Sequence, residues 1–150
     1  MSAFHFDRTW TFAVPPDELW DVVTRTDHYQ RWWTWLRRLD APEVRAGAVA
    51  ACVIQAPLPY ALRLHIAIER AEAPSTIETY VRGDLDGPAR LEIEPTAGGS
   101  SARLAWELEV RGRALRQVAR VARPVMVWAH DRVVATGVDQ FRTRALDGRR

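Results

Sequence analysis

His130 and Arg8 are the side chains whose positions suggest chemistry first. In the helix expected over residues 113–146, His130 lies about 60° from the centre of the apolar stripe, at ~100° per residue. One interpretation is that its side chain reaches the interior, where it acts as a polar group or as an acid and base. The other is that it lies at the boundary of the helix face and hydrogen-bonds Asp131, a tyrosine or the backbone. Arg8 interrupts an apolar strand face, where a buried guanidinium needs a carboxylate or an anionic ligand group, unless the strand register differs.

Other kinds of catalytic or metal chemistry find no support in the sequence. All 21 basic residues are arginines, so a lysine Schiff base is excluded. The four histidines show no metal-ligand spacing and Cys52 is the single cysteine, so we expect no metal site, no internal disulfide and no cofactor. The chain has no Gly-x-Ser-x-Gly elbow, and residues 98–101 predict a hairpin turn rather than a phosphate loop because no helix follows.

The composition is typical of one soluble domain. The chain has 150 residues, 47% of them apolar, seven tryptophans and a formal net charge of +2. No apolar run reaches the length of a membrane span and the first residues do not form an export signal, so we expect a cytoplasmic protein without integral membrane association. Arginines at 113, 116, 120 and 123 favour a solvated helix face over a nucleic-acid or lipid-headgroup site.

Hydrophobic periodicity predicts an α+β fold. Residues 4–13 alternate as a strand with one covered face, and two short helices follow, over 16–24 and through residue 33. Six further strands are predicted, divided by turn residues, at 42–45, 48–55, 60–69, 76–85, 89–94 and 102–110. An antiparallel sheet with one covered face needs a cover, and the only element long enough is the helix over 113–146.

Small residues on that helix suggest space beneath it. The apolar stripe carries Ala119, Ala122, Ala129 and Gly137 where a filled core usually has leucine or isoleucine. The strand residues expected to face it are large: Leu62, Leu64, Ile66, Leu91, Ile93 and Trp106. Either the helix lies very close to the sheet, or an apolar cavity remains between them; we favour the cavity.

Four segments, together with this order of elements, carry a resemblance to a known superfamily. They are FAVPPDELW at 12–20, YQRWW at 29–33, GDLDG at 83–87 and WAHDRVV at 128–134. With them the chain resembles, over nearly its whole length, the START-like, or polyketide cyclase/dehydrase and lipid-transport (SRPBCC), superfamily. The resemblance implies a helix-grip fold, with about seven antiparallel strands and a long C-terminal helix packed across the sheet. It also implies an interior pocket, shared by carriers, cyclases and regulatory modules, and no single activity.

The leading hypothesis is therefore the binding of a small hydrophobic molecule or lipid between the sheet and the C-terminal helix. The residues expected to bind it are Trp32, Trp33, Trp35, Tyr60, Leu62, Leu64, Leu91, Trp106, Met126 and His130. The alternative is an enzyme of the polyketide cyclase/aromatase or dehydratase type, in which His130, Tyr60 or Arg8 exchanges protons or stabilises an enolate. A third possibility is an interaction module in which Trp128 anchors a partner or a homodimer.

Overall fold

The computed structural model describes residues 3–33, 35–55, 61–111 and 113–146. Within the last range, the side chains described are those of residues 117, 124 and 127–146. Tyr60 and the side chain of Met126 therefore lie outside the described part of the chain.

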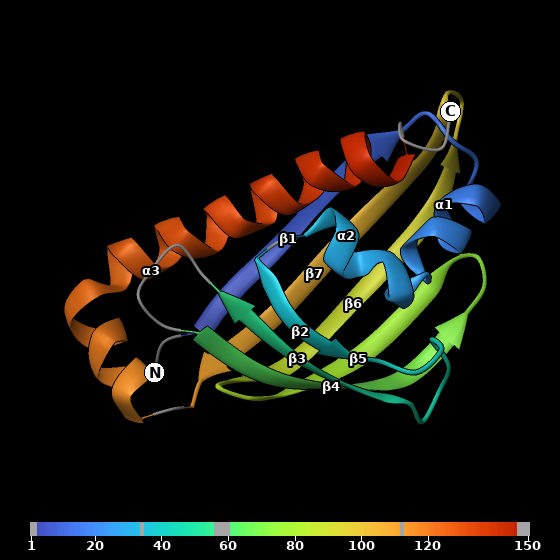
Figure 1. Cartoon of the computed structure of the whole chain (residues 1–150). Helices are drawn as coiled ribbons and strands as arrows, with labels where there is room; N and C mark the ends of the chain where they lie inside the picture. The colour runs from blue at the N-terminus through green and yellow to red at the C-terminus, as the bar shows by residue number, and fades with distance from the viewer. Residues whose placement is uncertain (1–2, 34, 56–60, 112, 147–150) are drawn as a thin grey trace.

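Seven antiparallel strands form one curved sheet, as the sequence predicts (Figure 1). Across the sheet the order is β1-β7-β6-β5-β4-β3-β2, so the first strand closes one edge beside the last. The strands are β1 (Ala3–Phe12), β2 (Leu36–Asp40), β3 (Val49–Gln55), β4 (Ala61–Glu72), β5 (Thr76–Gly83), β6 (Leu85–Thr96) and β7 (Gly99–Val110).

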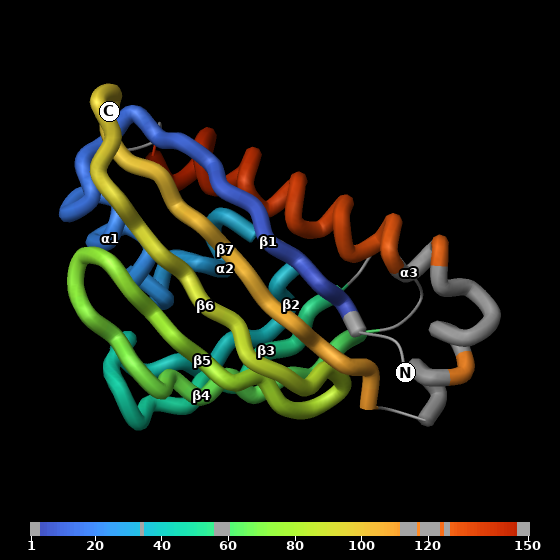
Figure 2. The backbone as a smooth tube through the Cα atoms, turned by 180° about the vertical axis from the view of Figure 1, so that it is seen from behind, coloured from blue at the N-terminus to red at the C-terminus, as the bar shows by residue number. Residues whose placement is uncertain are grey.

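The helices fall into two groups. Three short ones follow β1, namely α1 (Pro16–Val23), the 3₁₀ helix η1 (Thr26–His28) and α2 (Tyr29–Trp32). The long α3 (Arg113–Gln140) ends in a π-helical segment, η2 (Phe141–Leu146). Seen from either side, α3 crosses one face of the sheet, and the strands curve around it (Figures 1 and 2). This arrangement confirms the helix-grip architecture.

One end of the sheet is closed by a well-packed core. Leu19 of α1 is 0% exposed and lies in a buried cluster with Phe12, Trp32 and Phe141. Two hydrogen bonds to the backbone fasten this end, from the Ser100 hydroxyl to the carbonyl of Val14 at 2.8 Å, and from Arg144 to the carbonyl of Trp32 at 2.8 Å. The short helices and η2 therefore form a filled core, whereas the middle of α3 covers the rest of the sheet.

Arg8 lies on the expected face of β1 but is not buried. Its register partner on β7 is Leu104, which faces α3, yet the side chain of Arg8 is exposed and its guanidinium carbon lies 5.7 Å from the centre of the Phe6 ring. An exposed guanidinium keeps its hydration, so Arg8 requires no buried carboxylate.

The strand predicted over residues 42–45 was wrong, and β2 occupies 36–40 instead. A register shift between Leu36 and Arg38 places Arg37 and Arg38 next to each other on the exposed side, so the apolar residues Leu36 and Leu39 are three apart. That spacing is typical of a helix or turn, which concealed the strand. Pro42 lies in the following loop, where the lack of an N–H group costs nothing.

The divider predicted at Asp86-Gly87-Pro88 lies inside β6. Gly87 has φ +152°, and a Cβ atom built on it would lie 1.9 Å from the carbonyl oxygen of Glu107 on β7. Glycine is required there because two backbones approach each other, not because the chain turns.

Replacing Gly87 with alanine therefore tests this close approach. Gly87→Ala is expected to lower the free energy of unfolding by about 3 kcal/mol, because the new methyl group must displace strand backbone. Gly98→Ala is the matched control, because a Cβ atom added at this residue of the β6–β7 turn would have no neighbouring atom within 4 Å. It should change the free energy of unfolding by less than about 0.5 kcal/mol. Equal urea midpoints for the two variants would contradict this account.

Candidate functional site

A cavity of about 370 Å³ lies between the sheet and the second half of α3. The helix contributes two adjacent rows of side chains, Ala129, Val133 and Gly137 in one and His130, Val134 and Val138 in the other. The sheet contributes mainly aliphatic side chains from β3 to β7, with Phe4 from β1 and Trp106 from β7. A larger hollow of about 620 Å³ on the outer face of the sheet is rimmed by Glu69, Glu78, Arg90 and Glu107, so its wall is far more polar than that of the inner cavity.

Six of the ten residues expected to bind a ligand line this cavity. They are Trp33, Trp35, Leu62, Leu64, Trp106 and His130. Trp32 and Leu91 lie in the buried cluster around Leu19 instead, where Trp32 packs against Phe141. Tyr60 and the Met126 side chain fall outside the described residues.

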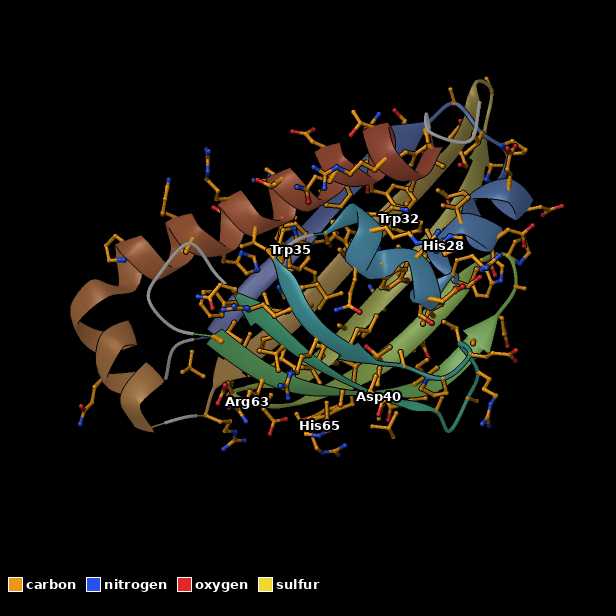
Figure 3. All side chains as sticks on the ribbon, viewed as in Figure 1. His28, Trp32, Trp35, Asp40, Arg63 and His65 are labelled. Atoms are coloured by element: carbon orange, nitrogen blue, oxygen red, sulfur yellow. The ribbon has the colours of Figure 1, made fainter. Side chains whose placement is uncertain are left out.

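Two tryptophans that precede β2 hold α3 in place. The indole N–H of Trp33 donates to the carbonyl of Gly137 at 2.8 Å, and that of Trp35 donates to Oε1 of Gln140 at 3.1 Å. Their rings stack at 5.4 Å, and Trp35 lies on the side of the sheet that faces α3 (Figure 3). A Cβ atom on Gly137 would lie 3.2 Å from the Trp35 ring, so this glycine allows the helix to contact the tryptophans directly.

His130 is enclosed by aromatic rings and both of its ring nitrogens have partners. Its side chain is 15% exposed and stacks on Phe4 at 5.1 Å. Nε2 accepts a hydrogen bond from the indole N–H of Trp106 at 3.1 Å, and Nδ1 lies 3.1 Å from the Asp131 carboxylate. The Trp106 bond requires a lone pair on Nε2, so the proton of the neutral ring lies on Nδ1, facing Asp131. An N–H group on Nε2 would point at the Trp106 N–H, with no acceptor between the two donors.

Polar groups elsewhere in the described cavity wall are also paired within the protein. The Thr79 hydroxyl donates to the carbonyl of Ala89 at 2.9 Å, and the three indole N–H groups are used as described above. No arginine or carboxylate is among the described residues that line the cavity. The described wall therefore presents an apolar surface with few unsatisfied polar groups, which suits an apolar guest.

Burial shifts the pKa of two groups close to this region. Desolvation raises the pKa of the Tyr29 phenol well above its ordinary value, and the hydroxyl donates to the carbonyl of Val23. Desolvation also raises the pKa of the Cys52 thiol, from an ordinary value of 9.0 to about 11. Both groups stay neutral near pH 7, so neither supplies an anionic nucleophile or base.

Two further features, a metal site and a membrane-spanning helix, were looked for among the described residues. They include no group of three potential metal ligands, and no described helix is long and apolar enough to cross a bilayer.

Val134 and Val138 were missed by the sequence reasoning, although they line the cavity beside His130. The sequence placed the apolar stripe through Ala129 and Gly137. The spacing of four residues from His130 to Val134 to Val138 was the available signal for a second row on the helix. Phe4, Ile54 and Leu85 were missed because only the register of the sheet brings them to the cavity. Thr79 and Val81 of β5 also line the cavity.

Trp128 lies on the opposite side of α3 from the cavity wall and is 53% exposed. It is accessible for the homodimer contact suggested by the sequence, which stays a prediction.

The fold and the cavity together define a helix-grip protein of the START-like class. The chain belongs to the family described as polyketide cyclase/dehydrase and lipid transport, whose model matches residues 3–146. No match was found among curated proteins.

Solved structures share this fold at low sequence identity. The chain is similar to the Zhui aromatase/cyclase from Streptomyces sp. R1128, with 13% identity and a TM-score of 0.75, over 97% of this chain and 98% of that one. A conserved protein from Geobacillus kaustophilus matches with 9% identity, a TM-score of 0.76 and 94% of each chain covered. The di-domain aromatase/cyclase StfQ of the steffimycin pathway matches with 12% identity and a TM-score of 0.73. This match covers 97% of this chain and 52% of the StfQ chain.

The buried thiol generates a prediction about pH. Above pH 9 the unfolded chain loses the Cys52 proton while the folded chain keeps it up to about pH 11, so the unfolded state binds fewer protons in this window. The free energy of unfolding should therefore fall with rising pH by about 1.4 kcal/mol per unit. Denaturant unfolding of wild type and Cys52→Ala between pH 8 and 11 measures this dependence. The contribution of the thiol is the difference between the two proteins in how the free energy of unfolding changes with pH. The same pH dependence in both would refute it.

Proposed function

We propose that this protein binds a small, uncharged, hydrophobic molecule or lipid in the cavity beneath α3. The observation that carries the proposal is the apolar cavity of about 370 Å³, whose described polar groups are all hydrogen-bonded within the protein. Ligand pockets commonly have volumes of about 300–1,000 Å³ and predominantly apolar walls. A guest here would be held by dispersion and by release of water, since the wall offers it few free hydrogen-bonding groups.

The shape of the wall favours rigid, flat guests. Trp33 and Trp35 stack on each other with an interplanar angle of 29°, and both rings border the cavity. Across the cavity, Trp106 stacks on Phe6 at 4.4 Å and is fixed by its bond to His130. Aromatic walls that are already positioned lose little entropy when a guest binds.

An enzyme of the aromatase/cyclase type is the alternative function, and the family together with two of the similar structures supports it. Such an enzyme needs a group that moves a proton within the pocket. His130 is the titratable residue in the described wall, but its Nε2 lone pair is occupied by the Trp106 N–H. Catalysis through His130 would therefore require this hydrogen bond to open, whereas ligand binding would not.

A larger side chain at Ala129 tests whether the cavity is the binding site. Ala129 is 2% exposed and lines the cavity, so Ala129→Leu places three extra carbon atoms there. Titration with the neutral fluorescent probe N-phenyl-1-naphthylamine should show saturable binding to wild type and at least about fivefold weaker binding to Ala129→Leu. Ala135→Leu, on the exposed side of the same helix, is the control and should bind like wild type. Equal affinities for all three proteins would disprove binding in the cavity.

A charged guest separates the two functions. Methyl 2-naphthoate and 2-naphthoate differ mainly in charge, and an apolar wall cannot replace the hydration of a carboxylate. The ester should bind at least about 100-fold more tightly at pH 7, because desolvating an unpaired ion costs several kcal/mol. Isothermal titration calorimetry measures both affinities. Comparable affinities would show that a cation or donor pair serves the cavity, which would favour the enzyme over the binding protein.

A further inference from the structure

The outer face of the sheet, opposite the cavity, divides into two halves with different electrostatics. On or just beyond β1 and β4 to β7, four arginines form close ion pairs with carboxylates, whereas Arg82 of β5 lies over the Tyr80 ring at 4.6 Å. The close pairs are Arg70 with Glu72 at 2.7 Å, Arg90 with Glu92 at 3.2 Å, Arg103 with Asp7 at 2.5 Å and Arg111 with Asp86 at 3.4 Å. In this half most of the arginines therefore have a carboxylate partner.

The half formed by β2, β3 and the start of β4 is different. A hollow of about 500 Å³ lies there, bordered by Arg38, Arg63, His65 and Asp40. All four side chains are exposed, and none has an ion-pair or hydrogen-bond partner among the described residues. Figure 3 shows Asp40, Arg63 and His65 on the side of the sheet away from α3. Charged groups are therefore gathered around a hollow without forming ion pairs with one another, and the Asp84 carboxylate accepts the backbone N–H of Arg63 at 2.8 Å.

The strand register arranges these groups in two rows. Arg38 pairs with Val53 and Val53 with Arg63, so the two arginines lie on either side of a small apolar residue. Their Cα atoms are two strand spacings apart, about 10 Å, which long guanidinium side chains can bridge toward one anion. In the neighbouring row, Asp40 pairs with Ala51 and Ala51 with His65. Asp40 is two residues along β2 from Arg38, about 7 Å away.

We propose that this hollow binds a small soluble molecule that carries a phosphate group and, a few ångströms away, an ammonium group. Arg38 and Arg63 hold the phosphate through charge-assisted hydrogen bonds over Val53. The Asp40 carboxylate binds the ammonium group, and Ala51 and Val53 provide the floor. The two opposite charges of the ligand match the two rows. The site is on the other face of the sheet from the cavity, so it does not depend on the function proposed above.

O-phosphoethanolamine, inorganic phosphate and ethanolamine test the proposal when each is titrated into ¹⁵N-labelled protein at low ionic strength. Saturable amide shifts are expected at residues 38–40, 51–53 and 63–65, with O-phosphoethanolamine bound about fivefold more tightly than phosphate. Arg38→Gln or Arg63→Gln should weaken both ligands at least about tenfold. Asp40→Asn should abolish the preference for O-phosphoethanolamine while phosphate still binds. Arg90→Gln, an exposed arginine of the ion-paired half, is the matched control and should bind both ligands like wild type.

Several results would overturn the proposal. One is unchanged binding of O-phosphoethanolamine by Arg38→Gln and Arg63→Gln, and another is a retained preference in Asp40→Asn. Vesicles of phosphatidylethanolamine present the same two charges on a lipid surface. If the protein sediments with those vesicles through Arg38 and Arg63 but ignores soluble O-phosphoethanolamine, the ligand is a membrane surface and the proposal of a soluble molecule is wrong. Thermal unfolding of each variant verifies that a loss of binding does not reflect a loss of fold.

Discussion

Three indole N–H groups determine where α3 lies over the sheet, and the cavity depends on them. Trp106 donates to His130, Trp33 to the carbonyl of Gly137 and Trp35 to Gln140, so contacts spread over ten residues of one helix, about 15 Å, are set by directional bonds. Between these points the helix presents Ala129, Val133 and Gly137. Hydrogen bonds thus fix the distance between helix and sheet, and side chains too small to fill it leave the space.

The same bonds decide the chemistry of that space. A tryptophan buried without a partner for its N–H would cost free energy, and each of these three indoles finds its partner on α3. Their N–H groups and the Nε2 lone pair of His130 are consequently unavailable to a guest. Many pockets offer a guest a few polar groups, but the described wall here offers hydrocarbon and aromatic faces. The family description covers both polyketide cyclases and lipid transport, and the described wall is the feature of this chain from which the proposed binding is argued.

The curved sheet separates two environments by the alternation of its strands. On β4, Leu62, Leu64 and Ile66 face the cavity, whereas Arg63 and His65 face outward. A shift of one residue in register would exchange these sets, so burial of the inner face also fixes the positions of the outer charges. The unpaired charges around the hollow beside β2 and β3 are thus held in place by the apolar packing on the far side of the same strands.

Much of the fold and part of the site could be predicted from residue order alone. Alternation identified the sheet, and the small residues facing Leu62, Leu64 and Trp106 indicated the cavity, because these signals are local and repeat along one element. The bulge in β2, the continuation of β6 through Gly87 and the roles of Phe4 and Ile54 depend on register between distant strands, which no local period records. Trp32 and Trp33 are adjacent and chemically identical, yet one fills the core and the other borders the cavity. Only the packing of α2 against α3 and η2 distinguishes them, because that choice rests on contacts with residues more than a hundred positions away.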